Sequence, residues 1–223
     1  MCGRMNHGKL TWAQLRDWLA LGLPPGLEEI PQRFNVAPTL MVPVAWRGGE
    51  GGSLTAGLAR WGLVPGWYRE PVKAWRAATF NARAEDVASK PAFRTAYGKG
   101  RCLVLASGYY EWQAGEGGKQ PWYIHPSGNA PALVFAGLMT SVRLPDYEGL
   151  TCTILTEAAP PELAFMHDRV PVMLGEAGQR DWLGCAGIEE VPRIGVESLA
   201  WHRVGRAVGA VRNEGPELIE PVD

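Results

Sequence analysis

Apolar side chains recur along this chain with two different spacings, which predict different elements. In residues 11–21 they fall at helical intervals behind a threonine that can cap a helix. Residues 90–100 and 176–184 predict two further short helices. Most other apolar runs are short and rich in β-branched residues, which favours strands. The predicted strands lie in residues 40–48, 54–65, 101–113 (with an internal turn), 120–126, 130–142, 149–159 and 206–223, the last with an extended tail.

Glycine and proline separate these runs. The chain has 28 Gly and 18 Pro, and the Pro-rich stretch 23–39 predicts a long ordered loop. A Gly-rich turn is expected at residues 48–52, and a helical turn at 160–168, where two prolines begin the segment. The fold class predicted is α+β: a curved, mostly antiparallel, open barrel-like sheet with a few short helices. No repeat or interdomain linker is visible, so we expect one domain over residues 1–223.

Composition narrows the class of protein. Hydrophobic residues make up 46% and charged residues 20%, which is ordinary for a soluble globular chain. No apolar run approaches the ~20 residues that span a bilayer, and no basic patch precedes an apolar leader. The sequence therefore predicts a cytoplasmic protein without a membrane partner.

The net charge is compatible with a nucleic-acid partner only if that partner binds at a local basic groove. A formal net charge of −1 argues against a strongly basic coat. Most of the 22 basic residues are arginines, whose planar fork suits phosphate. A GC-rich coding bias would produce the same skew, so this observation alone decides nothing.

The four cysteines do not form a C-x-x-C pair, which disfavours a zinc site or a redox dithiol. Cys102 and Cys152 lie inside apolar runs and are expected to be inert core thiols. Cys2 differs because it follows Met1 directly. Removal of Met1 would leave a free α-amine and a thiol on one residue, both nucleophiles near neutral pH. The plain alternative is that Cys2 is simply the second residue of a strand.

Polar clusters interrupt the apolar strand pattern at four places. Each residue has an ordinary structural alternative: a turn-closing Asn, a solvent-facing Glu, a satisfied His, a surface salt bridge. Together they supply a thiol and amine, an amide, a carboxylic acid and an imidazole, which an aldehyde-capturing site requires. A carboxyl wedged among aromatic side chains also has reason for a raised pKa. The clusters are Cys2-Gly3-Arg4, residues 80–85 with Asn81, Arg83 and Glu85, residues 107–112 with Glu111, and residues 166–171 with His167, Asp168 and Arg169.

Ordered motifs along nearly the whole chain carry a family resemblance. They read MCGR, RFNVAPT, RWGLVPGW, FNARAE, KPAFR, RCLVLASGYYEW, FAGLMT, TILTEAA, MHDRVPVML and PELIEP. The sequence thus resembles the SOS-response-associated peptidase (SRAP) family, whose members are abasic-site processing proteins. The resemblance implies a DNA-repair protein that cross-links itself to abasic sites in single-stranded DNA and is nucleoid-associated when bound.

The resemblance also implies a mechanism. Cys2, exposed by loss of Met1, would attack the ring-opened sugar aldehyde through its amine to give a Schiff base. Its thiol would then close a thiazolidine, an intramolecular step with a large effective concentration. An internal cysteine cannot close that ring because its nitrogen is tied up in an amide.

Roles for the other residues follow from the same resemblance. Glu111 would transfer protons, His167 would open the sugar and stabilise the Schiff base or promote β-elimination as a lyase, and Asn81 would orient the amine or the sugar. The family name implies a peptidase-like, autoproteolytic removal of Met1, although ordinary methionine trimming gives the same product. No cofactor or metal is implied, and we expect a monomer.

The expected DNA contacts are of two kinds. Arginines next to the reactive residues would grip phosphates, and other residues would stack on or wedge between bases. For each tryptophan the alternative is core packing. The candidates are Arg4, Arg83 and Arg169 for phosphates, and Trp67, Trp112 and Pro38 for bases.

Three other functions remain open at this point. Cys2, His167 and Asn81 resemble the Cys–His–Asn set of a cysteine peptidase. A non-catalytic single-stranded DNA-binding module would bind DNA reversibly and survive loss of Cys2. A thiol-redox protein is the weakest alternative, because one exposed cysteine would lack a resolving partner.

Overall fold

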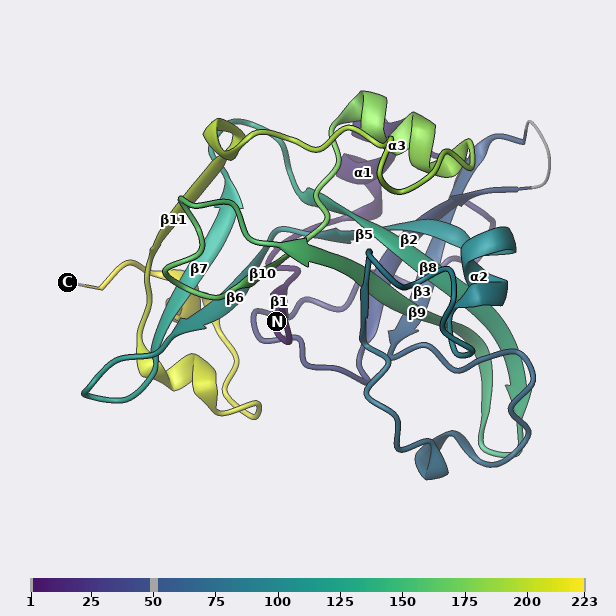
Figure 1. Ribbon diagram of the computed structural model, residues 1–223, viewed down its shortest axis with the longest axis horizontal. Helices are drawn as coiled ribbons and strands as arrows, with labels where there is room; N and C mark the ends of the chain where they lie inside the picture. Colours follow the sequence, from purple (N-terminus) through teal and green to yellow (C-terminus); the bar gives the residue numbers. More distant parts are fainter. Residues whose placement is uncertain (1, 49–51, 223) are drawn as a thin grey trace.

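A closed sheet organises the protein, which is described here by a computed structural model covering residues 2–48 and 52–222. Its strands hydrogen-bond in the order β9–β3–β2–β5–β8, and β8 pairs with β9 to close a barrel (Figure 1). All these pairings are antiparallel except β3 with β9. The strands are β2 Met41–Arg47, β3 Leu54–Trp61, β5 Arg101–Ala106, β8 Leu133–Leu144 and β9 Tyr147–Ala158.

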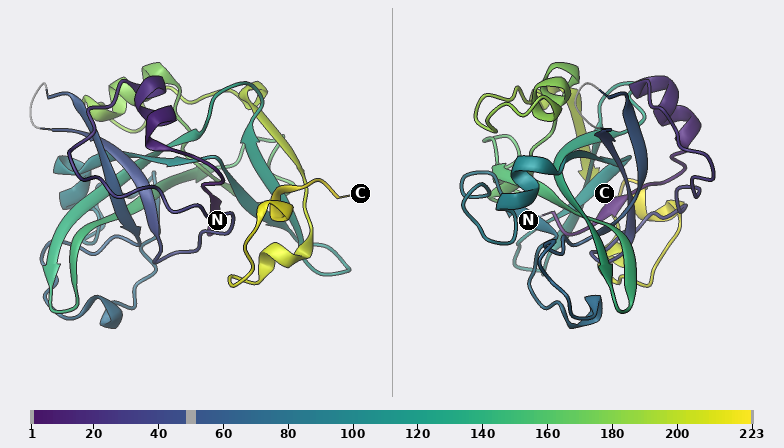
Figure 2. Two further views of the ribbon diagram at one scale, coloured as in Figure 1. Left: turned by 180° about the vertical axis from the view of Figure 1, so that it is seen from behind. Right: turned by 90° about the vertical axis from the view of Figure 1, so that its right-hand side faces the viewer.

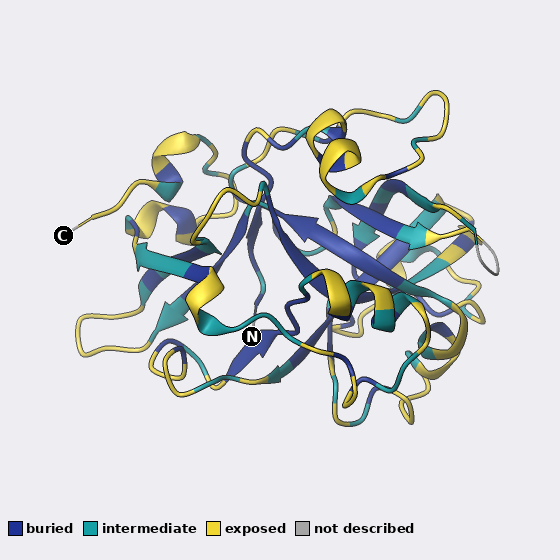
Figure 3. Cartoon of the chain, turned by 90° about the horizontal axis from the view of Figure 1, so that it is seen from above, coloured by how far each residue is buried: buried dark blue, intermediate teal, exposed yellow. Residues whose placement is uncertain are grey.

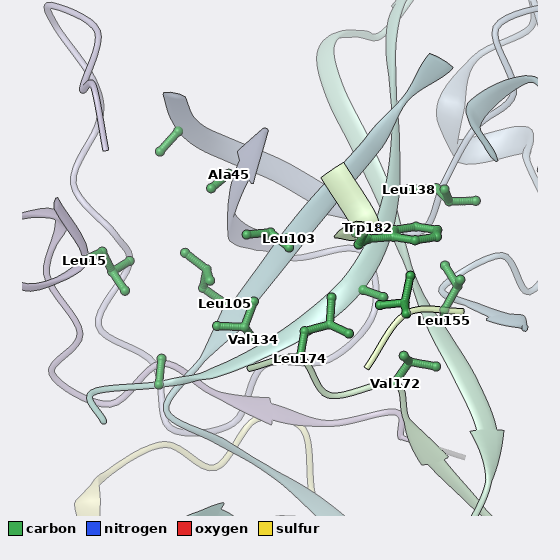
Figure 4. Close-up of a cluster of buried hydrophobic side chains, with 14 of the residues drawn as sticks. Leu15, Ala45, Leu103, Leu105, Val134, Leu138, Leu155, Val172, Leu174 and Trp182 are labelled. Atoms are coloured by element: carbon green, nitrogen blue, oxygen red, sulfur yellow. The ribbon is translucent and has the colours of Figure 1, made fainter. Parts of the chain in front are cut away.

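Two apolar clusters occupy opposite faces of these strands, because successive strand residues point to opposite sides. Helices α1 (Trp12–Leu19) and α3 (Glu176–Leu183) cover one face, where Leu15 and Trp182 join a buried cluster that includes side chains of β5 and β8 (Figure 4). The indole N–H of Trp182 donates to the carbonyl of Cys102 at 3.0 Å. The side chains of Cys102 and Cys152 lie in the cluster on the other face, fully buried as predicted.

A smaller antiparallel sheet stands beside the barrel, in the order β1–β6–β7–β11 (Figures 1 and 2). Tyr109 and Ile124 on one of its faces join the barrel cluster. Tyr110 and Tyr123 on the other face are covered by the C-terminal segment. The strands are β1 Met5–Asn6, β6 Gly108–Gln113, β7 Gln120–Pro126 and β11 Leu199–Arg203.

Two short strands flank one end of β9. Strand β4 (Asn81–Arg83) pairs in parallel with β9 from Ile154 to Thr156, and β10 (Arg169–Pro171) pairs antiparallel from Ala158 back to Thr156. Strand β9 therefore fixes the positions of two of the predicted polar clusters relative to each other.

The sequence predictions hold for most elements, and the α+β fold class is confirmed. Thr11 caps α1 and forms a capping box with Gln14, and the helix predicted at 90–100 is α2 (Arg94–Lys99). The predicted turn at 48–52 falls mostly on residues 49–51, which lie outside the described residues. The 3₁₀ turns are η1 Val72–Ala74, η2 Val196–Ser198, η3 Arg206–Gly209 and η4 Pro216–Ile219.

The strand predicted in residues 206–223 is wrong. The described part of that segment forms η3 and η4, and the strand at this end of the chain is β11. Gly205, Gly209 and Gly215 interrupt the apolar pattern, and Gly215 adopts φ +133°, far from the negative φ of a regular strand. Strand β11 forms because it pairs with the edge of β7. This tertiary contact cannot be inferred from the local alternation of apolar and polar residues.

Asn35 ties the two ends of the chain together. Its side-chain oxygen accepts a hydrogen bond from Arg4 at 2.5 Å, and its amide nitrogen donates to the carbonyls of Ala210 and Asn213 at 3.0 and 2.8 Å. Arg4 also donates to the carbonyl of Val208 at 2.7 Å. Asn35 is fully buried, so these bonds replace all contact with water.

Burial follows the layers, with the sheet interiors buried and the outer helix faces and loops exposed (Figure 3). Among the described residues, no helix combines the length and apolar character needed to cross a bilayer. The monomeric state and the cytoplasmic location stay predictions.

We expect Asn35→Ala to lower the free energy of unfolding by about 3 kcal/mol, since it leaves several buried donors and acceptors unpaired. Urea denaturation monitored by circular dichroism measures this. Asn213→Ala, which removes one exposed bond to the carbonyl of Ala207, is the matched control and should cost less than about 1 kcal/mol. Equal losses in the two variants would contradict the role of Asn35.

Candidate active site

Cys2 is held directly by Asn81. The side-chain amide of Asn81, at the start of β4, donates to the carbonyl oxygen of Cys2 at 2.5 Å, and both residues are buried. The Cys2 sulfur lies 4.0 Å from the carbonyl oxygen of Arg4, a weak S–H contact. Burial raises the pKa of the Cys2 thiol, and the nearby carboxylate of Glu111 raises it further. The thiol therefore keeps its proton at neutral pH.

Glu111 lies on β6 and is buried. Desolvation raises the pKa of its carboxyl, while the imidazole of His167 acts in the opposite direction. Its Oε1 atom accepts a hydrogen bond from the backbone N–H of Trp112 at 3.3 Å. The charge of Glu111 also contributes to the raised pKa of Tyr109, after burial and the Cys2 thiolate. Glu111 thus lies within electrostatic reach of both Cys2 and His167.

His167 has two contacts that require opposite protonation states of Nδ1. The backbone N–H of Arg169 lies 3.0 Å from Nδ1 and donates only when Nδ1 carries a lone pair. The carboxylate of Asp168 lies 2.6 Å from the same atom and accepts only when Nδ1 carries a proton. Arg169 therefore holds a ring whose Nδ1 carries a lone pair, and Asp168 holds a ring whose Nδ1 carries a proton, either as the neutral tautomer or as the imidazolium. His167 has a suitable partner on either side of a proton transfer.

Arg169 and Glu85 lock the strands that carry these groups. The guanidinium of Arg169 binds both carboxylate oxygens of Glu85, with Nη2 2.9 Å from Oε2, and also donates to the carbonyl of Thr156. This charged hydrogen-bond pair lowers the pKa of Glu85 to about 2. The pair joins β10 to the segment that follows β4. His167 lies just before β10, and Asn81 is the first residue of β4.

The three arginines predicted to contact phosphates differ in solvent exposure. Arg4 and Arg169 are buried and bind protein carbonyls, and the guanidinium carbon of Arg4 lies 5.6 Å from the ring centre of Trp112. The side chain of Arg83 is 64% exposed, with Nε 3.8 Å from the carboxylate of Glu85. Arg83 is thus the accessible cation of the three. Phosphate binding by all three stays a prediction.

The predicted base contacts also differ in exposure. Trp67 is 57% exposed, touches Trp75 edge-on at 6.0 Å between ring centres, and borders a cleft of about 490 Å³ that Arg69 and Lys99 also line. Trp112 and Pro38 are half-buried. Trp67 is therefore not a core residue, and its stacking on bases stays a prediction.

The structure brings together the four predicted catalytic residues from four separate segments. Cys2 and Asn81 are hydrogen-bonded, and Glu111 couples electrostatically to Cys2 and His167. Sequence reasoning missed the supporting roles of Glu85, Thr156 and Asn35. Glu85 belongs to one of the four polar clusters recognised in the sequence, but no local pattern indicates that it pairs with Arg169. Within residues 2–48 and 52–222, His, Cys, Asp and Glu side chains form no group that could hold a metal ion.

Comparison with known proteins identifies the family of this chain. The profile of the SOS response associated peptidase (SRAP) family matches residues 1–211. The chain belongs to the SRAP family. The profile ends before the C-terminal residues, so one SRAP domain over the whole of residues 1–223 stays a prediction.

Several SRAP relatives carry descriptive names. The abasic site processing protein YedK of Escherichia coli K12 is 33% identical over the full length of both chains. The abasic site processing protein HMCES of Gallus gallus is 36% identical, over 74% of this chain and 56% of its own. YoqW of Bacillus subtilis, also named an abasic site processing protein, is 30% identical over 89% of each chain.

A solved structure has the same fold as this chain. A protein from Bacteroides thetaiotaomicron superposes with a TM-score of 0.80, covering 99% of this chain and 100% of the other. Its sequence identity is 22%, so this likeness concerns the fold alone.

The ion pair between Glu85 and Arg169 predicts a pH-dependent contribution to stability. The pKa of Glu85 falls from 4.5 to about 2 on folding, so the stabilisation is complete above about pH 4.5 and is lost as the pH falls towards 2. We expect wild type to be more stable than Glu85→Gln at pH 7, with the difference shrinking in that window. Denaturant titrations at several pH values measure it.

The matched control is Glu148→Gln, which removes an exposed ion pair with Arg143. Exposed pairs contribute little, so this variant should stay close to wild type throughout. A Glu85→Gln variant as stable as wild type at pH 7 would contradict the prediction.

Proposed function

We propose that this protein recognises abasic sites in single-stranded DNA and links itself to them covalently through Cys2. Its relatives are named abasic site processing proteins, and the chain belongs to their family. The observation that carries the proposal is the 2.5 Å hydrogen bond from Asn81 to the Cys2 carbonyl. It holds the residue that follows Met1 near the carboxyl of Glu111, which in turn interacts with the imidazole of His167.

The chemistry begins with removal of Met1, which lies outside the described residues. Either the site itself or an aminopeptidase cleaves the Met1–Cys2 bond and frees the α-amine of Cys2. The amine nitrogen attacks the aldehyde carbon of the ring-opened abasic sugar. The carbonyl oxygen leaves as water, and a Schiff base remains.

Ring closure uses the thiol. The sulfur of Cys2 bonds to the Schiff-base carbon, and the thiol proton ends on the nitrogen, giving a thiazolidine. One water is released in total, and nothing is oxidised or reduced. The raised pKa of the Cys2 thiol suits this step, because the sulfur arrives with the proton that the nitrogen needs. Both nucleophiles belong to one residue, so the second step is intramolecular.

Glu111 and His167 divide the proton transfers. The raised pKa of Glu111 makes it a carboxylic acid better able to protonate the departing hydroxyl during dehydration. A neutral His167 with its proton on Nδ1, bonded to Asp168, accepts the proton of the sugar hydroxyl at Nε2 as the ring opens, and Asp168 then stabilises the imidazolium. The same Schiff base would be the starting point for a lyase step by β-elimination.

For DNA binding we propose Arg83 as the direct phosphate contact and Trp67 as a stacking surface. Arg4 and Arg169, which are buried, would reach a phosphate only at the edge of the site. Trp112 and Pro38, both half-buried, would meet bases nearer the lesion.

A cysteine peptidase built on Cys2 and His167 is less well supported. Such an enzyme needs a thiolate, and burial together with Glu111 raises the pKa of Cys2 instead.

Cross-linking to abasic single-stranded DNA tests the proposal. Wild type should give a shifted band on a denaturing gel. Cys2→Ala should give none, because it keeps the α-amine but lacks the thiol that closes the ring, and the Schiff base alone is reversed by hydrolysis. Cys185→Ala is the matched control, since Cys185 is an exposed free cysteine elsewhere, and should cross-link normally. No shifted band with wild type, or a normal one with Cys2→Ala, would overturn the proposal.

A chain with an uncleavable residue placed before Cys2 separates the two enzyme classes. A thiazolidine-former should lose cross-linking completely, because the nitrogen becomes an amide. A peptidase would keep its thiol chemistry.

Glu111→Gln should slow cross-linking about 100-fold while DNA binding persists. Because an acid acts only when protonated, the wild-type rate should fall as pH rises through the raised pKa of Glu111. The variant should lack that limb. Glu116→Gln, at the exposed tip of the β6–β7 hairpin, serves as control. Single-turnover rates at several pH values measure this, and a wild-type pH profile retained by Glu111→Gln would refute the assignment.

A further inference from the structure

A row of paired residues crosses the small sheet outward from Glu111. Glu111 on β6 is the register partner of Trp122 on β7, and Trp122 is the partner of Arg203 on β11. Directly paired residues of antiparallel strands project from the same face. The row therefore runs from the active site to the sheet edge over two strand spacings, about 10 Å. The three strands lie side by side in Figure 1.

The outer part of this row is an aromatic and cationic surface. The guanidinium carbon of Arg203 lies 5.4 Å from the ring centre of Trp122, and Phe165 meets the same ring edge-on at 5.1 Å. Gln113 fixes the indole by accepting its N–H at 3.1 Å. Arg203 is exposed and, among the described residues, forms no ion pair with a carboxylate. Its charge is available to an anion.

Phe165 stands out because it is 43% exposed only two residues before His167. The turn at 160–168 buries Leu163 and Met166 in the core, which leaves Phe165 on the outer side. An exposed phenyl ring held against a tryptophan, next to an arginine and continuous with a DNA-processing site, has the features of a base-stacking platform.

We infer that Phe165, Trp122 and Arg203 form a subsite for a nucleotide flanking the abasic site in single-stranded DNA. The base stacks on the exposed face of Phe165, and Arg203, braced on Trp122, binds a phosphate. This inference rests on the proposed function. An abasic sugar offers no base, so stacking energy has to come from its neighbours, and a platform beside His167 and Glu111 supplies it on one flank.

Cross-linking rates with three abasic oligonucleotides of equal length test this: lesion central, at the 5′ end, and at the 3′ end. Phe165→Ala should slow subsaturating cross-linking about tenfold with the central lesion. The effect should vanish with one end-lesion substrate, the one that lacks the bound flank. Phe165→Trp should restore the rate, since it keeps a stacking ring. Thermal unfolding should confirm that the variants fold.

Arg203→Gln should reduce the slope of log affinity against log salt by about 0.7, the value for one phosphate on a single strand. Arg143→Gln, on a distant exposed hairpin, should leave that slope unchanged. Unchanged rates with Phe165→Ala on all three substrates would overturn the inference and point to a protein partner for this surface. An equal loss on all three would also overturn it, because the effect would then act through the His167 turn.

Reversible binding of undamaged single-stranded DNA, followed by fluorescence anisotropy, separates this inference from the proposed function. If wild type never cross-links, yet Phe165→Ala weakens binding about tenfold, the subsite stands and the covalent function fails. If wild type cross-links, yet Phe165→Ala changes neither binding nor rate, only the subsite fails.

Discussion

The hydrogen bond from Asn81 to the carbonyl of Cys2 is the interaction on which this site depends. Cys2 precedes a strand of two residues, so the small sheet alone gives it little support. Asn81 is itself fixed because β4 pairs with β9, and β9 also carries β10. The ion pair of Arg169 with Glu85 then joins the two flanking segments. One strand of the barrel thereby sets where Cys2 and the imidazole of His167 lie.

Burial favours the protonated, uncharged forms of the acidic groups in this site. Burial raises the pKa values of both Cys2 and Glu111, and His167 has a partner for each of its protonation states. The proposed condensation, which releases water, needs groups that give and take protons in turn. The arrangement lowers stability locally: among the described residues, Asn81 Oδ1 and Arg169 Nε are buried without a hydrogen-bond partner. Such uncompensated polar atoms are common at functional sites.

Local patterns predicted much of the fold and marked the polar groups that meet at the candidate site, but not the residues that support them. Spacing and a capping threonine located α1, and polar interruptions of apolar runs marked Cys2, Asn81, Glu111 and His167. The parallel pairing of β9 with β3 and β4, and the pairing of β11 with β7, are tertiary contacts. No local sequence pattern indicates them. Position next to a reactive residue also says nothing about where a guanidinium points, so the internal bonds of Arg4 and Arg169 came only from the structure.

Tandem mass spectrometry of the N-terminal peptide after reaction with abasic single-stranded DNA tests the central claim most directly. The account predicts a peptide that begins at Cys2 and carries the sugar remnant less one water. Its nitrogen and sulfur should both be blocked, with no thiol left to alkylate. A peptide that still begins with Met1, or a DNA remnant attached to any residue other than Cys2, would contradict it.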